Sequence, residues 1–150
     1  MKINQGDVFA IKTQKGFGFI QFIQVWEHGI ELVRILEPIK ERAEVSQTEV
    51  DILERFSIQF LVKIAYKRKL IEKVGQFTIP KYYSIPIKVR TQHNVRGEFL
   101  GWHIVDVQTL KRELKKELSK EDLTLSPHGI FNDTLIIEYL EKNWRLEHWK

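Results

Sequence analysis

The sequence predicts an α+β fold: a strongly bent or SH3-like antiparallel β-sheet in the N-terminal part, then mixed strands, then two C-terminal helices. Three observations support this prediction. Two dense apolar runs at 6–11 and 16–22 are separated by a short polar link, which is the layout of a β-hairpin. Every second residue from 58 to 66 is apolar or aromatic, a period of two over the ten residues 57–66. From residue 107 onward the apolar spacing lengthens to three or four, as in amphipathic helices.

The second strand of the opening hairpin is apolar on both of its faces. Phe17 and Phe19 would face one side, whereas Ile20 and Phe22 would face the other. Such a strand cannot lie on a solvated sheet, so we expect a closed or doubly covered β-structure. Its glycines do not form a phosphate loop, because a strand rather than a helix follows them. We predict one turn glycine and one strand glycine that makes room for a neighbouring group.

A third strand and a short helix are expected next. The apolar run at 30–36 predicts the strand, and the proline after it ends the run. Ser46 and Glu49 have the spacing of a capping box, which places a helix N-terminus here. Val50 and Leu53 would then form the apolar side of that helix.

The regular alternation at 57–66 predicts one long strand, whose apolar face comprises Ile58, Phe60, Val62, Ile64 and Tyr66. A returning strand is expected within 70–77, which would complete a β-rich lobe of roughly residues 1–78. Residues 76–86 contain two of the four prolines together with several aromatic side chains. We interpret this segment as a buried crossing rather than a flexible tether.

An α+β lobe of roughly residues 79–150 follows, so that residues 1–150 form a single domain with two lobes. A strand ending near residue 90 and another at 99–107 are expected to pair around a turn at 94–97. A helix is then predicted from one apolar stripe, formed by Val107, Leu110, Leu114 and Leu118. Asn132 or Asp133 would cap a final helix. Its inward face would comprise Leu135, Ile136, Tyr139 and Leu140.

Composition narrows the class of protein. The chain has 150 residues, a net charge of +4 and no cysteine. The lack of cysteine excludes a disulfide framework, a thiolate zinc site and a cysteine nucleophile. No apolar run approaches the ~18 residues of a membrane span, and the polar start does not resemble a signal peptide. We therefore expect a cytoplasmic protein without a membrane partner.

The sequence contains no motif that indicates catalysis. None of the five histidines has the spacing of a metal site, and His103, in a predicted strand, is the one expected to be partly buried. None of the four serines lies in a nucleophile elbow. We expect no enzymatic activity, no metal and no cofactor. Residues 1–75 contain 12 basic and 10 acidic side chains, and residues 76–150 contain the same numbers, so neither half is more basic than the other.

Basic and aromatic side chains interleave in two segments, 63–69 and 81–96. Small β-barrels bind single-stranded nucleic acid with such side chains, and an acidic protein partner would use the same surface. Aromatic and arginine side chains dominate many protein interfaces. The candidate partner-binding residues are Tyr82, Tyr83, Arg90, Arg96 and Trp102.

The order of several short motifs resembles the Immunity protein 26 family. These motifs are the glycine-rich aromatic opening at 6–21, the Pro-plus-aromatic segment at 79–83, the Gly-Trp strand at 101–104 and the region 129–139. Members of this family are bacterial proteins encoded beside polymorphic toxins, which they are considered to neutralise. The resemblance implies non-covalent occlusion of a cognate toxin domain and no catalytic residue. The sequence specifies neither the toxin nor the oligomeric state. The alternative function is that of a small β-barrel protein that binds nucleic acid.

Because the chain is basic, it is unsuited to plug the cationic groove of a nuclease directly. We expect it to bind away from such a groove or to recognise a toxin with an acidic face.

Overall fold

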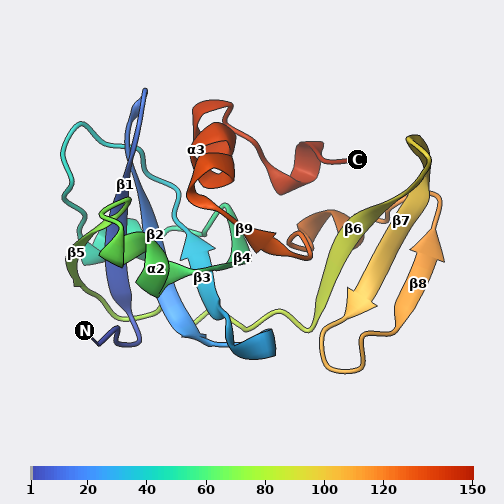
Figure 1. Cartoon of the computed structure of the whole chain (residues 1–150), viewed down its shortest axis with the longest axis horizontal. Coiled ribbons are helices and arrows are strands. Elements are labelled where there is room, and N and C mark those ends of the chain that lie inside the picture. Colours follow the sequence, from blue (N-terminus) through green and yellow to red (C-terminus); the bar gives the residue numbers. More distant parts are fainter. Residues whose placement is uncertain (1) are drawn as a thin grey trace.

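The computed structural model, described for residues 2–150, places two β-sheets side by side along the long axis of the molecule (Figure 1). The first sheet has the strand order β5-β1-β2-β3-β4-β9 and the second has the order β6-β7-β8. Within the described residues there are also three short α-helices. The α+β class is therefore confirmed.

The first sheet consists of β1 (Asp7–Thr13), β2 (Gly16–Val25), β3 (Glu31–Ile35), β4 (Phe56–Phe60), β5 (Glu72–Gln76) and β9 (Ile130–Phe131). The second consists of β6 (Lys88–Val95), β7 (Glu98–Asp106) and β8 (Arg112–Lys115). The helices are α1 (Gln47–Val50), α2 (Val62–Lys67) and α3 (Asp133–Glu141), with 3-10 turns η1 (Glu27–Gly29), η2 (Asp122–Thr124) and η3 (Leu146–His148). Strands β1 to β4 form an antiparallel meander, β5 returns to β1, and β9 pairs in parallel with β4.

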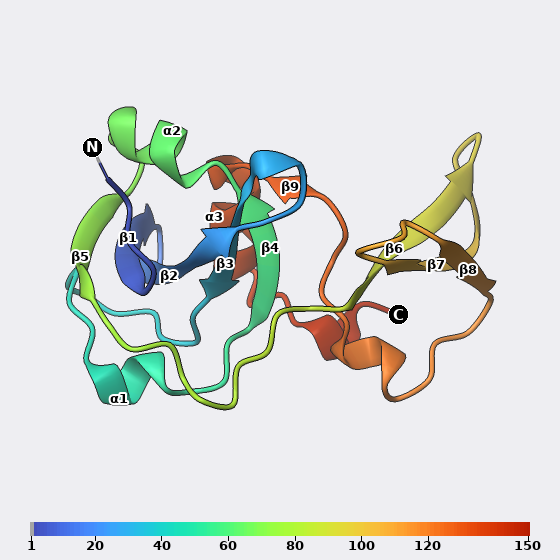
Figure 2. The ribbon, with the colours of Figure 1, turned by 90° about the horizontal axis from the view of Figure 1, so that it is seen from below.

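The opening hairpin is covered on both faces, as predicted. Phe9 and Ile20 belong to the larger apolar core, which α2 and α3 cover. Val8 and Phe19 belong to a second core on the opposite face, together with Val50 of α1. Figure 2 shows α1 and α2 on opposite sides of the sheet. Both faces of these strands therefore exclude water, which accounts for their continuous apolar sequence.

Gly18 makes room for the final helix, which confirms the predicted role of a strand glycine. A Cβ at this position would lie 2.5 Å from Cδ1 of the buried Leu140 in α3. Gly16 has a φ of +125° in the turn of the hairpin, a conformation that favours glycine. The two glycines thus serve the turn and the packing of α3 respectively.

The predicted capping box is present, but the helix behind it is a single turn. Oγ of Ser46 accepts a hydrogen bond from the Glu49 amide, and Oε1 of Glu49 accepts one from the Ser46 amide. Val50 is buried as expected, whereas Leu53 lies beyond the helix and is 66% exposed. The prediction for Leu53 was therefore wrong.

The long strand predicted at 57–66 is wrong in its second half. Strand β4 ends at Phe60, and α2 follows after one residue. Val62 and Ala65 are buried at helical spacing, whereas Ile64 is exposed. Val62, Ile64 and Tyr66 alternate with Lys63 and Ala65, which resembles a strand, but Val62 and Ala65 have helical spacing, and the core selects the helix.

The helix predicted from the stripe of Val107 to Leu118 is also wrong. Oδ1 of Asp106 accepts hydrogen bonds from the amides of Gln108 and Thr109, which reverses the chain. The next residues then form β8, antiparallel to β7. Of the two predicted C-terminal helices, only the last is present as an α-helix.

That last helix, α3, agrees with the prediction. Oδ1 of Asn132 accepts a hydrogen bond from the Leu135 amide at 2.8 Å, and Ile136 and Leu140 are buried. The helix and β9 before it lie with the first sheet, although the chain has already formed the second sheet by this point (Figure 1). The chain thus crosses between the sheets a second time.

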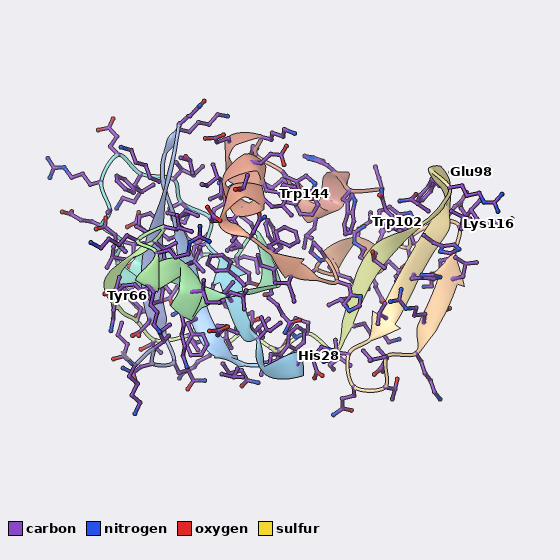
Figure 3. The ribbon with its side chains drawn as sticks, viewed as in Figure 1. His28, Tyr66, Glu98, Trp102, Lys116 and Trp144 are labelled. Carbon is purple, nitrogen blue, oxygen red and sulfur yellow. The ribbon has the colours of Figure 1, made fainter. Side chains whose placement is uncertain are left out.

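Tryptophans bridge the two sheets. Trp144 stacks on Tyr139 of α3 with ring centroids 4.5 Å apart, and its ring lies 5.6 Å from that of Trp149. Trp149 in turn meets Trp102 of β7 edge-on at 4.9 Å. Figure 3 shows Trp144 beside the first sheet and Trp102 on the second. The C-terminal residues therefore fix the sheets to each other through aromatic contacts.

Candidate protein-interaction surface

The structure places the predicted partner-binding residues in three regions. Tyr82 and Tyr83 lie together on the crossing segment that links the two sheets. Arg90 and Trp102 are neighbours in the second sheet and both are buried. Arg96 is exposed in the β6–β7 turn, where its φ is +53°. The five residues thus do not form one surface.

A buried arginine of β3, Arg34, anchors the crossing segment. Its guanidinium donates to Oε1 of Glu54, Oε1 of Gln21, the carbonyls of Val50 and Ile52, and the hydroxyl of Tyr82. Sequence reasoning missed this residue. The signal was an arginine in the middle of an apolar strand, because a charge in such a place must be buried and paired.

Tyr82 is held at its hydroxyl end and exposed at its ring. The hydroxyl lies 2.9 Å from Nη2 of Arg34 and donates to the carbonyl of Ile52 at 2.9 Å. Partial burial raises the pKa of this phenol, so it stays protonated at neutral pH. The residue is nevertheless 50% exposed, and a rigid aromatic side chain is therefore presented to solvent.

Tyr83 is less exposed than Tyr82. Its hydroxyl lies 2.9 Å from Oγ of Ser57 in β4, and Arg34 lies 5.6 Å from its ring centroid. Burial raises the pKa of Tyr83 to about 12. Both tyrosines therefore fasten the crossing segment to the first sheet.

Two hollows lie where the sheets meet. One, of about 640 Å³, lies between residues 52–56, η2 and η3, and the other, of about 420 Å³, lies beneath residues 83–88. Glu54, Thr124 and Ser126 line both. We call the two hollows together the junction groove.

Exposed apolar side chains surround the junction groove. Leu53 and Ile52 line its larger hollow, and Ile85 and Ile87 line its smaller one. Ile87 is 75% exposed. Clustered exposed apolar side chains of this kind mark interaction sites on soluble proteins. The geometry fits a protein partner, because the half-exposed Tyr82 is tied through its hydroxyl to Ile52, one of these residues.

Arg90 holds the far wall of the junction groove in place. It donates to the carbonyls of Leu123 and Leu125 near η2 and to those of Leu146 and Trp149 near η3. Its guanidinium also lies 4.5 Å from the Trp149 ring centroid and 5.3 Å from that of Trp102. Burial lowers the pKa of Arg90 to about 10, so it remains charged at neutral pH. Arg90 and Trp102 thus support the surface from inside.

An ion pair between Arg145 and Glu37, both of which line the larger hollow, also stabilises the groove. Both guanidinium nitrogens Nη1 and Nη2 of Arg145 bind the carboxylate of Glu37, and Arg55 donates to the Glu37 carbonyl. The hydrogen bond from Arg145 holds the pKa of Glu37 below its ordinary value. The C-terminal residues are therefore fixed to the loop after β3.

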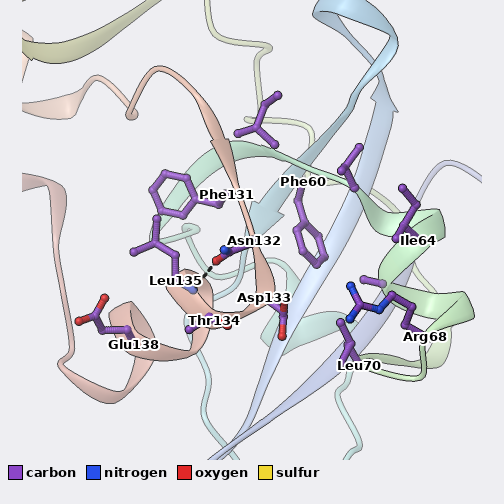
Figure 4. Close-up of a pocket in the computed structure, with 13 residues that line it drawn as sticks. Phe60, Ile64, Arg68, Leu70, Phe131, Asn132, Asp133, Thr134, Leu135 and Glu138 are labelled. Carbon is purple, nitrogen blue, oxygen red and sulfur yellow. Dashed lines mark hydrogen bonds between the residues drawn. The ribbon is translucent and has the colours of Figure 1, made fainter.

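A separate hollow of about 450 Å³ lies between α2 and α3 (Figure 4). Phe60 and Phe131 form its apolar floor, while Arg68 faces it from one side and Asp133 from the other. None of the predicted partner-binding residues lines it.

Histidines collect around the second sheet. The rings of His93 and His103 lie 4.4 Å apart, and Nη1 of Arg112 lies 3.3 Å from Nδ1 of His103. Partial burial and these cationic neighbours lower the pKa of His103. As expected, His103 is partly buried, but so is His93, which the prediction did not include. In residues 2–150 no three His, Asp or Glu side chains are arranged to hold a metal ion. No helix in that range is long and apolar enough to span a membrane.

No family model matches the chain, and neither a curated protein nor a solved structure is significantly similar to it.

Proposed function

We propose that this protein is a non-catalytic immunity protein that neutralises a bacterial toxin domain by occlusion, and that the junction groove is its contact surface. The observation that carries this proposal is the group of exposed apolar side chains at the groove, Ile52, Leu53 and Ile87, together with the half-exposed Tyr82, whose hydroxyl donates to the Ile52 carbonyl. Its hydroxyl is already bound to Arg34, so little side-chain entropy is lost when a partner covers the ring. The order of the sequence motifs supports the immunity role.

The arrangement of the first sheet supports an SH3-like form of the fold within this proposal. Strands β1 to β4 form a meander, α2 occupies the next connection, and β5 returns to β1. We further propose that the protein acts in the cytoplasm, which suits a chain without cysteine.

Co-purification tests the proposal. The chain is co-expressed with the C-terminal domain of a large toxin-like protein encoded by a neighbouring gene, and complex formation and protection from growth arrest are measured. Leu53→Glu is expected to weaken the complex at least tenfold, because it places a charge in the apolar surface. Val25→Glu is the matched control, since Val25 is similarly exposed but lies outside the groove. Equal loss in both variants, or no complex with the wild-type chain, contradicts the proposal.

The alternative of a nucleic-acid-binding barrel loses one of its supports. Its cationic cluster, Lys67, Arg68 and Lys69, was expected at the end of a strand but lies at the end of α2. The corresponding test is binding of an oligonucleotide at low salt, with the salt dependence expected for phosphate contacts.

A further inference from the structure

The entire positive excess of the chain lies in the second sheet. Residues 88–116 contain seven lysines and arginines against three acidic side chains, and the rest of the chain has equal numbers of each. Comparing the two halves of the sequence conceals this, because acidic residues after 116 balance the count. The second sheet is therefore a basic element on a molecule that is otherwise neutral.

Within the described residues 2–150, strand β8 leaves one edge of this sheet without a partner. It is the outermost strand in Figure 1 and Figure 2, and it pairs with β7 on one side only. The Asp106 amide donates to the Lys111 carbonyl, and the antiparallel pairing alternates from there. The backbone groups of Arg112 and Leu114 therefore point away from β7, toward solvent.

The opposite edge of the sheet is occupied. The Arg90 amide donates to the Ser126 carbonyl, and the His128 amide donates to the Arg90 carbonyl. The chain before β9 thus covers this part of β6. The edge of β8, in contrast, has no segment paired along it within residues 2–150.

The side chains along β8 indicate what could pair there. Leu114 is 54% exposed, and it shares a face of the sheet with Arg112 and His103 by register. Lys111 and Lys116 are exposed at the two ends of the strand. Lysines on an edge oppose pairing with a second, equally basic copy, whereas they attract an acidic strand.

We propose that β8 is a docking edge for an acidic, extended peptide segment of a partner protein, which joins the second sheet as a fourth strand. The backbone of Arg112 and Leu114 offers both donors and acceptors, which a peptide satisfies and a phosphate chain, having only acceptors, does not. Strand β8 itself carries no aromatic side chain, Trp102 is buried, and the exposed ring of Phe99 lies on β7, so the β8 edge provides no stacking platform for bases. The inference is independent of the toxin proposal.

Synthetic peptides test this inference on the full chain. The probe is a blocked, labelled peptide of alternating glutamate and valine, titrated by fluorescence anisotropy while backbone amide exchange is followed by NMR. We expect it to bind and to protect the amides of Arg112 and Leu114. A peptide with lysine in place of glutamate should not bind. An N-methylated glutamate–valine peptide, which keeps the charge but cannot pair, should also fail to bind.

Reversing the charge of the lysines at the ends of β8 is the second part of the experiment. Lys111→Glu with Lys116→Glu should weaken binding of the glutamate–valine peptide at least tenfold, whereas the matched pair Lys63→Glu with Lys67→Glu on α2 should not. Equal binding of the N-methylated peptide, or an unchanged affinity after reversal at 111 and 116, overturns the inference. Tighter binding of oligothymidylate with protection of the same amides also overturns it, in favour of nucleic acid.

Discussion

The hydroxyl of Tyr82 lies 2.9 Å from Nη2 of Arg34, so an exposed ring on the crossing segment is tied to a buried cation in the first sheet. The same hydroxyl donates to the carbonyl of Ile52, next to the exposed Leu53. One side chain thus joins the interior of the sheet to the junction groove. Because the hydroxyl contacts the interior and the ring contacts solvent, substitutions of Tyr82 can test the two parts of the side chain separately.

Tyr82→Phe should affect stability more than binding. Arg34 keeps its other acceptors, so we expect the free energy of unfolding to fall by about 1 kcal/mol. Tyr82→Ala should weaken the toxin complex at least tenfold, because it removes the ring. Urea unfolding and calorimetric titration measure the two effects. If Tyr82→Phe weakens binding as much as Tyr82→Ala, the ring is not the anchor.

Arg34→Met should be among the most destabilising single substitutions. It leaves the buried Gln21 and the carboxylate of Glu54 without their donor, and breaking a buried ion pair costs about 3–5 kcal/mol. Arg34→Lys should restore only part of this, because one ammonium cannot reach the whole acceptor set. Arg68→Met, on an exposed arginine of α2's C-terminal end, is the control. Similar losses at both positions in urea unfolding would contradict the assignment.

Gly18 and Leu140 should show coupled effects on stability. Gly18→Ala places a methyl group 2.5 Å from Leu140 Cδ1, and such overpacking costs about 1–3 kcal/mol. In the background Leu140→Ala the same substitution should cost much less, because the space is then free. A double-mutant cycle by urea unfolding measures the coupling energy. Additive losses would mean that the helix does not press on the strand at this point.

The sequence predicted the elements whose local chemistry and core contacts agree. The opening hairpin has apolar residues for two covered faces, and α3 has both an Asn132 cap and a buried stripe. The secondary-structure prediction was wrong where the spacing of apolar residues fits both a strand and a helix. Val62, Ile64 and Tyr66 have the spacing of a strand, whereas Val62 and Ala65 have that of a helix. The turn at Asp106 outweighed the helical spacing of Leu110 and Leu114.

The candidate surface was only partly predictable. Tyr82 and Tyr83 were identified from the interleaving of basic and aromatic side chains at 81–96; Tyr83 lines the smaller hollow, and Tyr82 binds the carbonyl of Ile52, which lines the larger one. Ile52 and Leu53 were not identified, because their exposure depends on α1 ending after one turn. The burial of Arg90 depends on carbonyls more than thirty residues away, which no local pattern reveals.

Acidification should reduce stability between neutral pH and the folded-state pKa values of His103 and His128, both of which are lowered from 6.5. Partial burial is the main cause in each, with Arg112 as a further cause in both, His93 for His103 and His28 for His128. In that range the unfolded chain binds more protons, so the free energy of unfolding falls as pH falls and is fully present above 6.5.

Urea midpoints at pH 7.5 and at successively lower pH values measure this histidine effect. The variant carrying His103→Gln and His128→Gln should show a flatter dependence above the range where carboxylates titrate. His148→Gln, on an exposed histidine near the C-terminus, is the control and should leave the slope unchanged. An unaltered slope in the double variant would place the acid sensitivity elsewhere.

Trp149→Ala should loosen the second sheet more than the first. The indole lies over the Arg90 guanidinium at 4.5 Å and against Trp102 at 4.9 Å, and it is only partly exposed. Its removal should lower the free energy of unfolding by about 2–3 kcal/mol, while the backbone carbonyl still accepts from Arg90. Amides of β6 and β7 should then exchange faster, and those of β1 and β2 should not.

Deleting Trp149 and Lys150 provides the sharper comparison, because it also removes the carbonyl that Arg90 binds. The deletion should accelerate exchange in β6 beyond the level of Trp149→Ala, since a buried guanidinium loses an acceptor. Lys150→Ala alone, with its exposed side chain, controls for changes at the chain end. If exchange rises equally in both sheets, the two unfold as one unit, and the C-terminal residues then stabilise the whole molecule rather than the attachment of its second sheet.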